Sequence, residues 1–233
     1  MHEGRKGSRA DDTSTLKKHI HKYVHKDTLR YVKPSFPDGG AKALRGWNHL
    51  ELAHMLLPLQ YTATQSLLDD INDNKLKITE HDWPRFLYPD GRIFDLDNEF
   101  EDLFRGHLLL RVMKHIYTGH STWNQGPGHQ VGKSSHAQKM GMTSVTSRAI
   151  AYAAVQARFA ICSSQDWGAD DRDFSNEEFF WQVVEIIDDE EDNATINYFN
   201  EKLYKPVGGC GPKKSAAERT KEQRKRARTT VPY

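Results

Sequence analysis

The chain has 233 residues, of which 37% are apolar, and its mean hydropathy of −0.77 is low for a globular domain. No run approaches the roughly 18 apolar residues of a membrane span, and the first residues contain no apolar signal-peptide core. We therefore exclude a membrane protein and expect an intracellular one. The low use of cysteine, with only Cys162 and Cys210, is typical of a reducing compartment.

Charge is strongly segregated along the chain, although the formal net charge is only +1. Residues 1–33 carry a net charge of +5, residues 34–204 carry −11 and residues 205–233 carry +7. An acidic body between two basic ends indicates recognition of charged partners and says little about the fold.

The first third of the chain predicts a tail followed by three helices. Residues 1–12 offer almost nothing apolar to bury and are predicted to be disordered. Apolar residues then recur at helical spacing, with Thr13 or Ser14 as the N-cap. After a break at 34–40, a second helix is expected over 47–57, ended by Pro58, and a short third one over 64–74.

Residues 83–94 and 98–117 carry different patterns. The first segment has a Pro-Asp-Gly turn between aromatic flanks, which fits either a short hairpin or an irregular aromatic loop packed on helices. The second has an apolar stripe at helical spacing, with acids near its start and bases near its end, and predicts an amphipathic helix. The stripe consists of Phe100, Leu103, Phe104, Leu108, Val112, Ile116 and Tyr117.

The stretch Gly141–Ser164 is small or apolar on almost every side, so it has to be wrapped by other helices. Thr143 or Thr146 is its expected N-cap. A capping box at 175–178 begins another helix, and a last one follows the acidic run 188–192. The sequence thus predicts an all-α domain over 13–204. It is a single irregular bundle of six or seven helices around a central helix at roughly 146–163, with at most one short hairpin.

No motif in the chain supports a defined chemistry. The stretch QGPGHQVGKS at 125–134 misplaces the glycine that a phosphate-binding loop requires. Twelve histidines raise the question of a metal, but neither HExxH nor CxxC is present. The acid pairs are expected to be solvated, and Cys162 falls in the apolar helix with no assignable base. We predict no catalytic residue, no cofactor and no metal site.

The basic C-terminal segment, residues 205–233, is predicted to be disordered and carries the clearest functional signal. Two clusters separated by a spacer resemble a bipartite nuclear import signal. The same charges could neutralise nucleic-acid phosphates, or could simply keep the chain soluble. The residues concerned are Lys213, Lys214, Arg224, Lys225, Arg226 and Arg228.

Several blocks of residues together resemble an uncharacterised family, a domain of unknown function known from mushroom-forming fungi. The blocks are WPxFLY with Asp90-Gly91, LFR at 103–105, KHIYT at 114–118, GMTSVT at 141–146, IAY at 150–152 and QxRFA at 156–160 with Ser163-Ser164. The resemblance covers roughly residues 11–204 and departs at 119–122, where a Ser/Pro-rich turn is expected. It implies an intracellular all-α domain and no particular activity.

Two functional interpretations remain from the sequence. The leading one is a non-enzymatic interaction protein of the nucleus, whose partners are an import receptor, DNA reached through the basic ends, or a basic protein bound by the acidic body. The alternative is an enzyme or small-ligand-binding protein with a site between the central helix and loop 119–140. Its cleft would be lined by Arg105, His115, Tyr152 and Arg158. An open reading frame without a selected role is a third interpretation.

Overall fold

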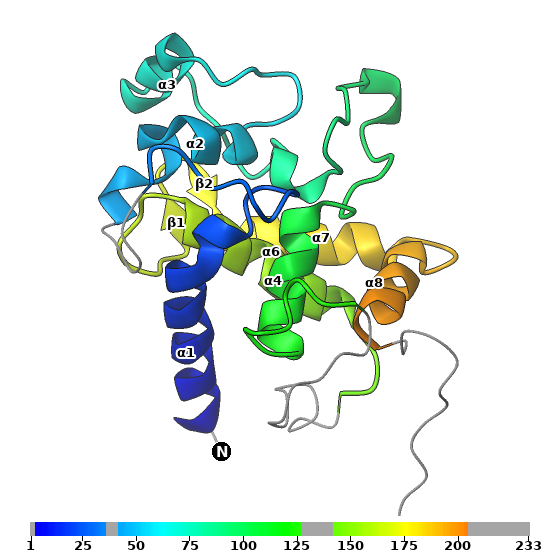
Figure 1. Ribbon diagram of the computed structural model, residues 1–233. Helices are drawn as coiled ribbons and strands as arrows, with labels where there is room; N and C mark the ends of the chain where they lie inside the picture. The colour runs from blue at the N-terminus through cyan, green and yellow to red at the C-terminus, as the bar shows by residue number, and fades with distance from the viewer. Residues whose placement is uncertain (1–2, 36–41, 127–141, 205–233) are drawn as a thin grey trace, which may run out of the picture.

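The computed structural model describes residues 3–35, 42–126 and 142–204 (Figure 1). Within these ranges the chain forms seven α-helices and one short hairpin. The helices are α1 (Glu3–His19), α2 (Leu50–Leu56), α3 (Gln65–Asn72), α4 (His107–Tyr117), α6 (Ser147–Ile161), α7 (Asn176–Asp188) and α8 (Ala194–Tyr204). The hairpin pairs β1 (Asp170–Asp171) with β2 (Phe174–Ser175) in antiparallel register. The predicted all-α class is confirmed.

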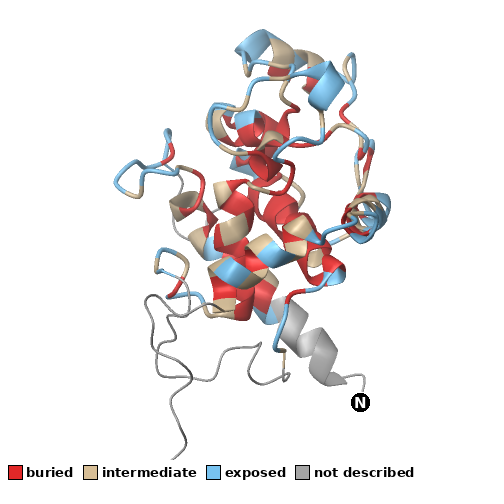
Figure 2. Ribbon diagram, turned by 90° about the vertical axis from the view of Figure 1, so that its right-hand side faces the viewer, coloured by how far each residue is buried: buried red, intermediate tan, exposed pale blue. Residues whose placement is uncertain are grey.

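Helix α6 is the centre of the bundle, as its apolar sequence predicts. All of its residues except Arg148 and Tyr152 are buried, and it packs against α7, α4, α1 and α2 (Figure 2). Alanines on several of its sides leave room for these neighbours to approach closely. The buried residues therefore form one continuous core around this helix.

Side-chain caps fix where three of the helices begin. Thr146 accepts a hydrogen bond from the Ala149 backbone N–H at the start of α6, which selects it over Thr143 as the cap. Ser175 accepts from the Glu178 N–H at the start of α7, as the capping box predicts. Thr64 caps α3 in the same way. Local sequence signals thus placed the start of α7 and limited the start of α6 to two threonines, between which the structure decides.

Helix α1 begins at Glu3, so the predicted start at Thr13 or Ser14 is wrong. Its second half packs Leu16 and, just beyond the helix, Ile20 into the core against α6 and α4. Once this part is helical, each further residue adds one hydrogen bond without a new nucleus. Half of residues 3–12 are good helix formers (Glu, Lys, Arg or Ala) and favour such an extension, whereas the two glycines oppose it.

The predicted helix over 98–117 is also too long, because α4 starts only at His107. Asp102 and Phe104 adopt positive φ values of 60° and 66°, which interrupt a helix, and Phe100 is exposed. Gly106 N–H donates to Leu87 O at 2.9 Å, and a Cβ at Gly106 would lie 2.0 Å from Phe86 O. The chain leaves the helical path here because the backbone docks against residues 86–87.

Residues 83–94 form the irregular aromatic loop, not the hairpin. A single 3₁₀ turn at Arg85–Leu87 carries Phe86 and Leu87 into the core. The ring of Trp83 lies 5.9 Å from that of Phe179 on α7 and meets Phe104 edge-on at 6.1 Å. This loop therefore joins α7 to the rest of the bundle. None of the described helices has the length and apolar character that crossing a membrane requires.

Candidate functional site

A groove lies between α1, α6, α7 and the segment 167–169. Its volume is about 760 Å³, within the usual size of small-molecule sites. It is lined by Thr13, Ser14, Lys17, Tyr152, Val155, Gln156, Trp167, Gly168, Ala169, Asn176, Glu177 and Phe180. We refer to it as the α1–α6–α7 groove.

The walls of this groove are aromatic. Tyr152 comes from α6 and Phe180 from α7, while Trp167 follows the end of α6. The indole of Trp167 is 50% exposed, and its ring meets the buried Phe159 edge-on at 5.0 Å. One side of the indole is thus anchored on the core, and the rest is available for contact.

Buried amides form the polar part of the groove. Gln156 is 2% exposed, and its Oε1 accepts from the Thr13 hydroxyl at 3.1 Å. Asn176 donates through Nδ2 to Gly168 O at 3.2 Å. Lys17 and Glu177 bring opposite charges to the lining. The titratable side chains that line the groove are Lys17, Tyr152 and Glu177, and none of the described lining residues is a histidine or a cysteine.

The four predicted cleft residues do not share one cavity. Tyr152 alone lines the groove, where its hydroxyl donates to Asp12 Oδ2 at 3.4 Å. Arg105 stacks its guanidinium over the ring of Tyr198 at 4.4 Å, in a shallow depression beside α8. Residues 127–140 of the loop expected to complete the cleft lie outside the described residues.

His115 and Arg158 are both buried and bonded within the fold. His115 contacts Tyr23 Oη through Nδ1 at 2.7 Å and Thr15 Oγ1 through Nε2 at 2.9 Å. Burial, with smaller contributions from two neighbouring histidines, lowers the pKa of His115 to about 3, so the ring is neutral near pH 7. Arg158 pairs with Asp171 at 2.9 Å.

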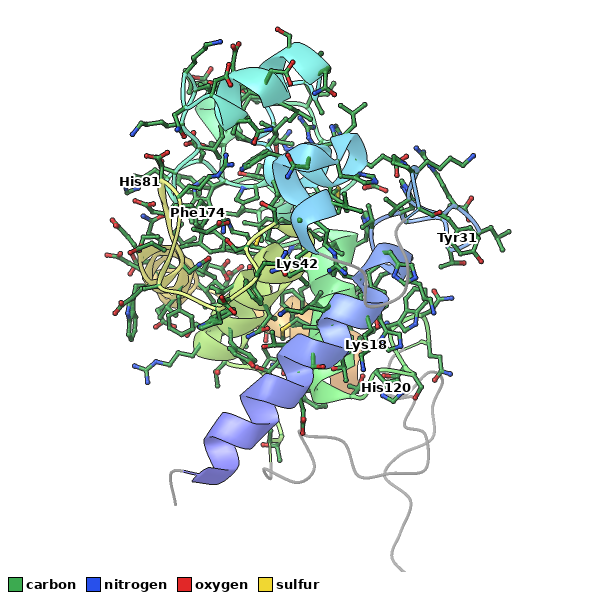
Figure 3. The ribbon with its side chains drawn as sticks, turned by 90° about the vertical axis from the view of Figure 1, so that its left-hand side faces the viewer. Lys18, Tyr31, Lys42, His81, His120 and Phe174 are labelled. Carbon is green, nitrogen blue, oxygen red and sulfur yellow. The ribbon has the colours of Figure 1, made fainter. Side chains whose placement is uncertain are left out.

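Sequence reasoning named Arg158 as a cleft candidate but missed the group of buried cations that it forms with two other residues around the last turn of α6. These α6-end cations are Lys42, Arg45 and Arg158. Arg45 is fully buried and donates to Ala160 O at 2.7 Å and to Lys17 O at 2.8 Å. The ammonium of Lys42 lies 3.3 Å from the centre of the Phe159 ring and 3.7 Å from Cys162 Sγ (Figure 3). The negative end of the α6 dipole favours cations at this position.

Burial is the main cause of the pKa shifts of Lys42 and of the neighbouring Cys162 thiol. It lowers the pKa of Lys42 to about 8 and raises that of the Cys162 thiol. A thiol with a raised pKa forms little thiolate, as expected for a packed cysteine. Lys42 and Arg45 are remote in sequence from Ala160. No local sequence pattern could therefore indicate that they lie beside the end of α6.

The basic clusters at Lys213, Lys214, Arg224, Lys225, Arg226 and Arg228 lie outside the described residues, as does most of the stretch 125–134. A family model described as a family of unknown function (DUF6698) matches residues 3–204. The chain belongs to this family. The match spans every helix described above and therefore includes the groove. Searches of curated proteins and of solved structures find no match for the chain.

Proposed function

We propose that this DUF6698 protein is a non-enzymatic binding protein. Its α1–α6–α7 groove takes a small molecule with a flat, mainly apolar body and one hydrogen-bonding edge. The observation that carries the proposal is the pairing of aromatic walls with buried amides in a cavity of about 760 Å³. An aromatic body would stack against Trp167 and Phe180, while its polar edge would reach Gln156 or Asn176.

The buried ionisable groups support binding rather than catalysis. Arg45, His115 and Arg158 each form hydrogen bonds or an ion pair within the fold, and none of them lines the groove. A catalytic group must instead face the reacting atoms. The proposal therefore takes up the small-ligand-binding part of the alternative interpretation, with the site at the α1–α6–α7 groove instead of beside loop 119–140.

The groove can be tested with anilinonaphthalene sulfonate, an anionic aromatic dye, followed by a library of neutral, flat aromatic fragments. We expect saturable dye binding to the full chain. Trp167→Ala should weaken it about 2- to 10-fold, because an aromatic contact contributes about 0.5–1.5 kcal/mol.

Trp181→Ala is a matched control for this experiment. Trp181 is also 50% exposed and lies on α7, but it does not line the groove. Binding that Trp167→Ala leaves unchanged, or that both variants weaken equally, would contradict the assignment of the groove.

A second proposal rests on charge segregation. The basic segment 205–233, with a net charge of +7, would contact nucleic-acid phosphates and direct the protein to the nucleus, whereas the body at 34–204 carries −11. From the resemblance described in the sequence analysis, the proposal also includes that the protein comes from a fungus.

One full-length variant separates the two roles of the segment. It replaces Lys213, Lys214, Arg224, Lys225, Arg226 and Arg228 with glutamine. If all six contact phosphates, they contribute on the order of −5 to the slope of log K against log salt for duplex DNA, and the variant should lose that contribution. Loss of nuclear accumulation without measurable DNA binding by the wild type would assign the segment to import alone. Wild-type behaviour of the variant in both assays would reject both roles.

A further inference from the structure

Three side chains with metal-binding atoms converge at the surface where the loop before Trp83 meets the start of α7. They are Glu80, His81 and Glu178, and one ligand atom from each lies within 4.8 Å of the others. We call this group the Glu–His–Glu cluster. His81 lies at the edge of the molecule in the view of Figure 3, near Phe174 of β2. The cluster is separate from the α1–α6–α7 groove and independent of the proposal made for it.

The distances within the cluster suit ligands of a single ion. His81 Nε2 lies 3.4 Å from Glu80 Oε1 and 3.8 Å from Glu178 Oε1. Two ligands that each lie about 2.0–2.2 Å from a tetrahedral zinc ion are roughly 3.3–3.5 Å apart. Small side-chain rotations therefore suffice to place all three atoms around one ion.

The backbone that carries the cluster is fixed from both sides. Glu80 uses its other oxygen, Oε2, to accept from the Ser175 N–H at 2.9 Å, which leaves Oε1 directed at His81. Trp83 and Phe179 are both buried and pack together at 5.9 Å, one on each ligand-bearing segment. The carboxylates are thus held close together by packing that does not depend on an ion, as a preorganised site requires.

The other ring nitrogen of His81 also has a side-chain partner. His81 Nδ1 lies 2.9 Å from the side-chain amide of Gln182, one helical turn after Glu178. When Nε2 binds a metal, Nδ1 carries the proton and needs an acceptor. Turning the Gln182 amide over brings its oxygen to that position, so the same residue can support the metal-binding tautomer.

The surroundings favour a cation. Glu185 and Asp189 extend the α7 face beyond Gln182 and border the same depression as His81. The side chain of Glu80 is only 11% exposed, and a buried carboxylate next to a second one is stabilised by positive charge. A divalent ion supplies two positive charges and uses all three ligand atoms.

We propose that the Glu–His–Glu cluster binds a divalent transition-metal ion of the zinc type. Imidazole with carboxylates suits zinc and its first-row neighbours, whereas magnesium and calcium prefer oxygen alone. The bound ion would join residues 80–81 to α7 and leave at least one coordination position for water or a ligand. Glu178 is remote in sequence from Glu80 and His81, which explains why spacing motifs did not reveal the site.

The test is calorimetric titration of the metal-free full chain with Zn²⁺, and with Mg²⁺ for comparison. We expect one Zn²⁺ site that His81→Ala and Glu178→Gln each weaken by more than about 100-fold. Gln182→Leu should weaken it about 10- to 100-fold, the usual effect of removing an outer partner. Co²⁺ bound to the same site should give visible d–d absorption that His81→Ala abolishes.

Glu177→Gln is the matched control, because it removes one charge from the same turn of α7 but no ligand. Its Zn²⁺ affinity should stay within about twofold of wild type. The side chains of His81 and Glu178 are 66% and 53% exposed, so their variants are expected to fold. Absence of Zn²⁺ binding to the wild type, or wild-type affinity in both ligand variants, would overturn the proposal.

Discussion

The α6-end cations and the Glu–His–Glu cluster are two groups of charged side chains that differ in burial and in their hydrogen-bond partners. Arg45 is fully buried and Arg158 nearly so, and both donate to oxygens of the fold at 2.7–2.9 Å. In the cluster, by contrast, His81 is 66% exposed, and oxygens of two carboxylates are directed at the same nitrogen.

This difference in burial distinguishes charged side chains that stabilise the fold from charged side chains that can bind a ligand. A buried guanidinium bonded to backbone carbonyls satisfies groups that would otherwise lose hydrogen bonds on folding. The exposed side chains of His81 and Glu178 gain little from the fold and can still bind a cation together with Oε1 of Glu80. We therefore expect substitutions in the first group to change stability, and substitutions in the second to change ligand binding.

The largest effect is expected for Arg45→Ala. It leaves Ala160 O and Lys17 O without this donor and creates a cavity, since Arg45 is fully buried. Unpaired buried groups cost about 1–3 kcal/mol each, so the free energy of unfolding should fall by about 3–5 kcal/mol. Urea denaturation measures this loss.

Arg30→Ala is the control, because Arg30 is 64% exposed and its pair with Glu51 spans 3.5 Å. It should change the free energy of unfolding by less than about 1 kcal/mol. Equal losses for Arg45→Ala and Arg30→Ala would contradict the structural role of the α6-end cations.

A smaller, pH-dependent effect is expected for Lys42. Burial lowers its pKa from 10.5 to about 8, so above pH 8 the folded protein binds fewer protons than the unfolded chain. The contribution of Lys42 to stability therefore rises with pH between about 8 and 10.5 and is least favourable below pH 8. The total change should be at most about 3 kcal/mol.

Lys42→Met isolates this contribution. At pH 7 the variant should be more stable than the wild type by about 1–3 kcal/mol, because methionine fills the space without a buried charge. The advantage should shrink as pH is raised from 8 to 10.5, in denaturation curves of both proteins. A constant difference across this range would show that Lys42 keeps an ordinary pKa in the fold.

Sequence reasoning succeeded where the determining contacts are local. The burial of α6 on nearly all sides, and the caps Thr146 and Ser175, could be predicted from residues within a few positions of each other. It failed at Gly106, where docking against Phe86 and Leu87 ends the helical path, although the apolar stripe continues upstream. Side-chain periodicity cannot report a backbone contact with another segment.

The candidate sites were less predictable for the same reason. Tyr152 was anticipated, but Trp167 and Phe180 join it only because the chain turns back through β1 and β2 into α7. Nothing in the sequence distinguishes His81 from the other histidines, because Glu178 and Gln182 come beside it only in the fold. A site assembled from distant segments becomes visible only when the packing between them is known.

The smallest effect is expected for Glu178→Gln in metal-free buffer. The change removes one charge near the N-terminus of α7 and one contact with His81, which lowers stability slightly. It also relieves repulsion with the Glu80 carboxylate, which raises it. Because these terms oppose each other on a side chain that is 53% exposed, the free energy of unfolding should stay within about 0.5 kcal/mol of wild type. A loss above about 1 kcal/mol by urea denaturation in the presence of a chelator would show that the Glu–His–Glu cluster stabilises the fold as Arg45 and Arg158 do, and would remove the contrast between them.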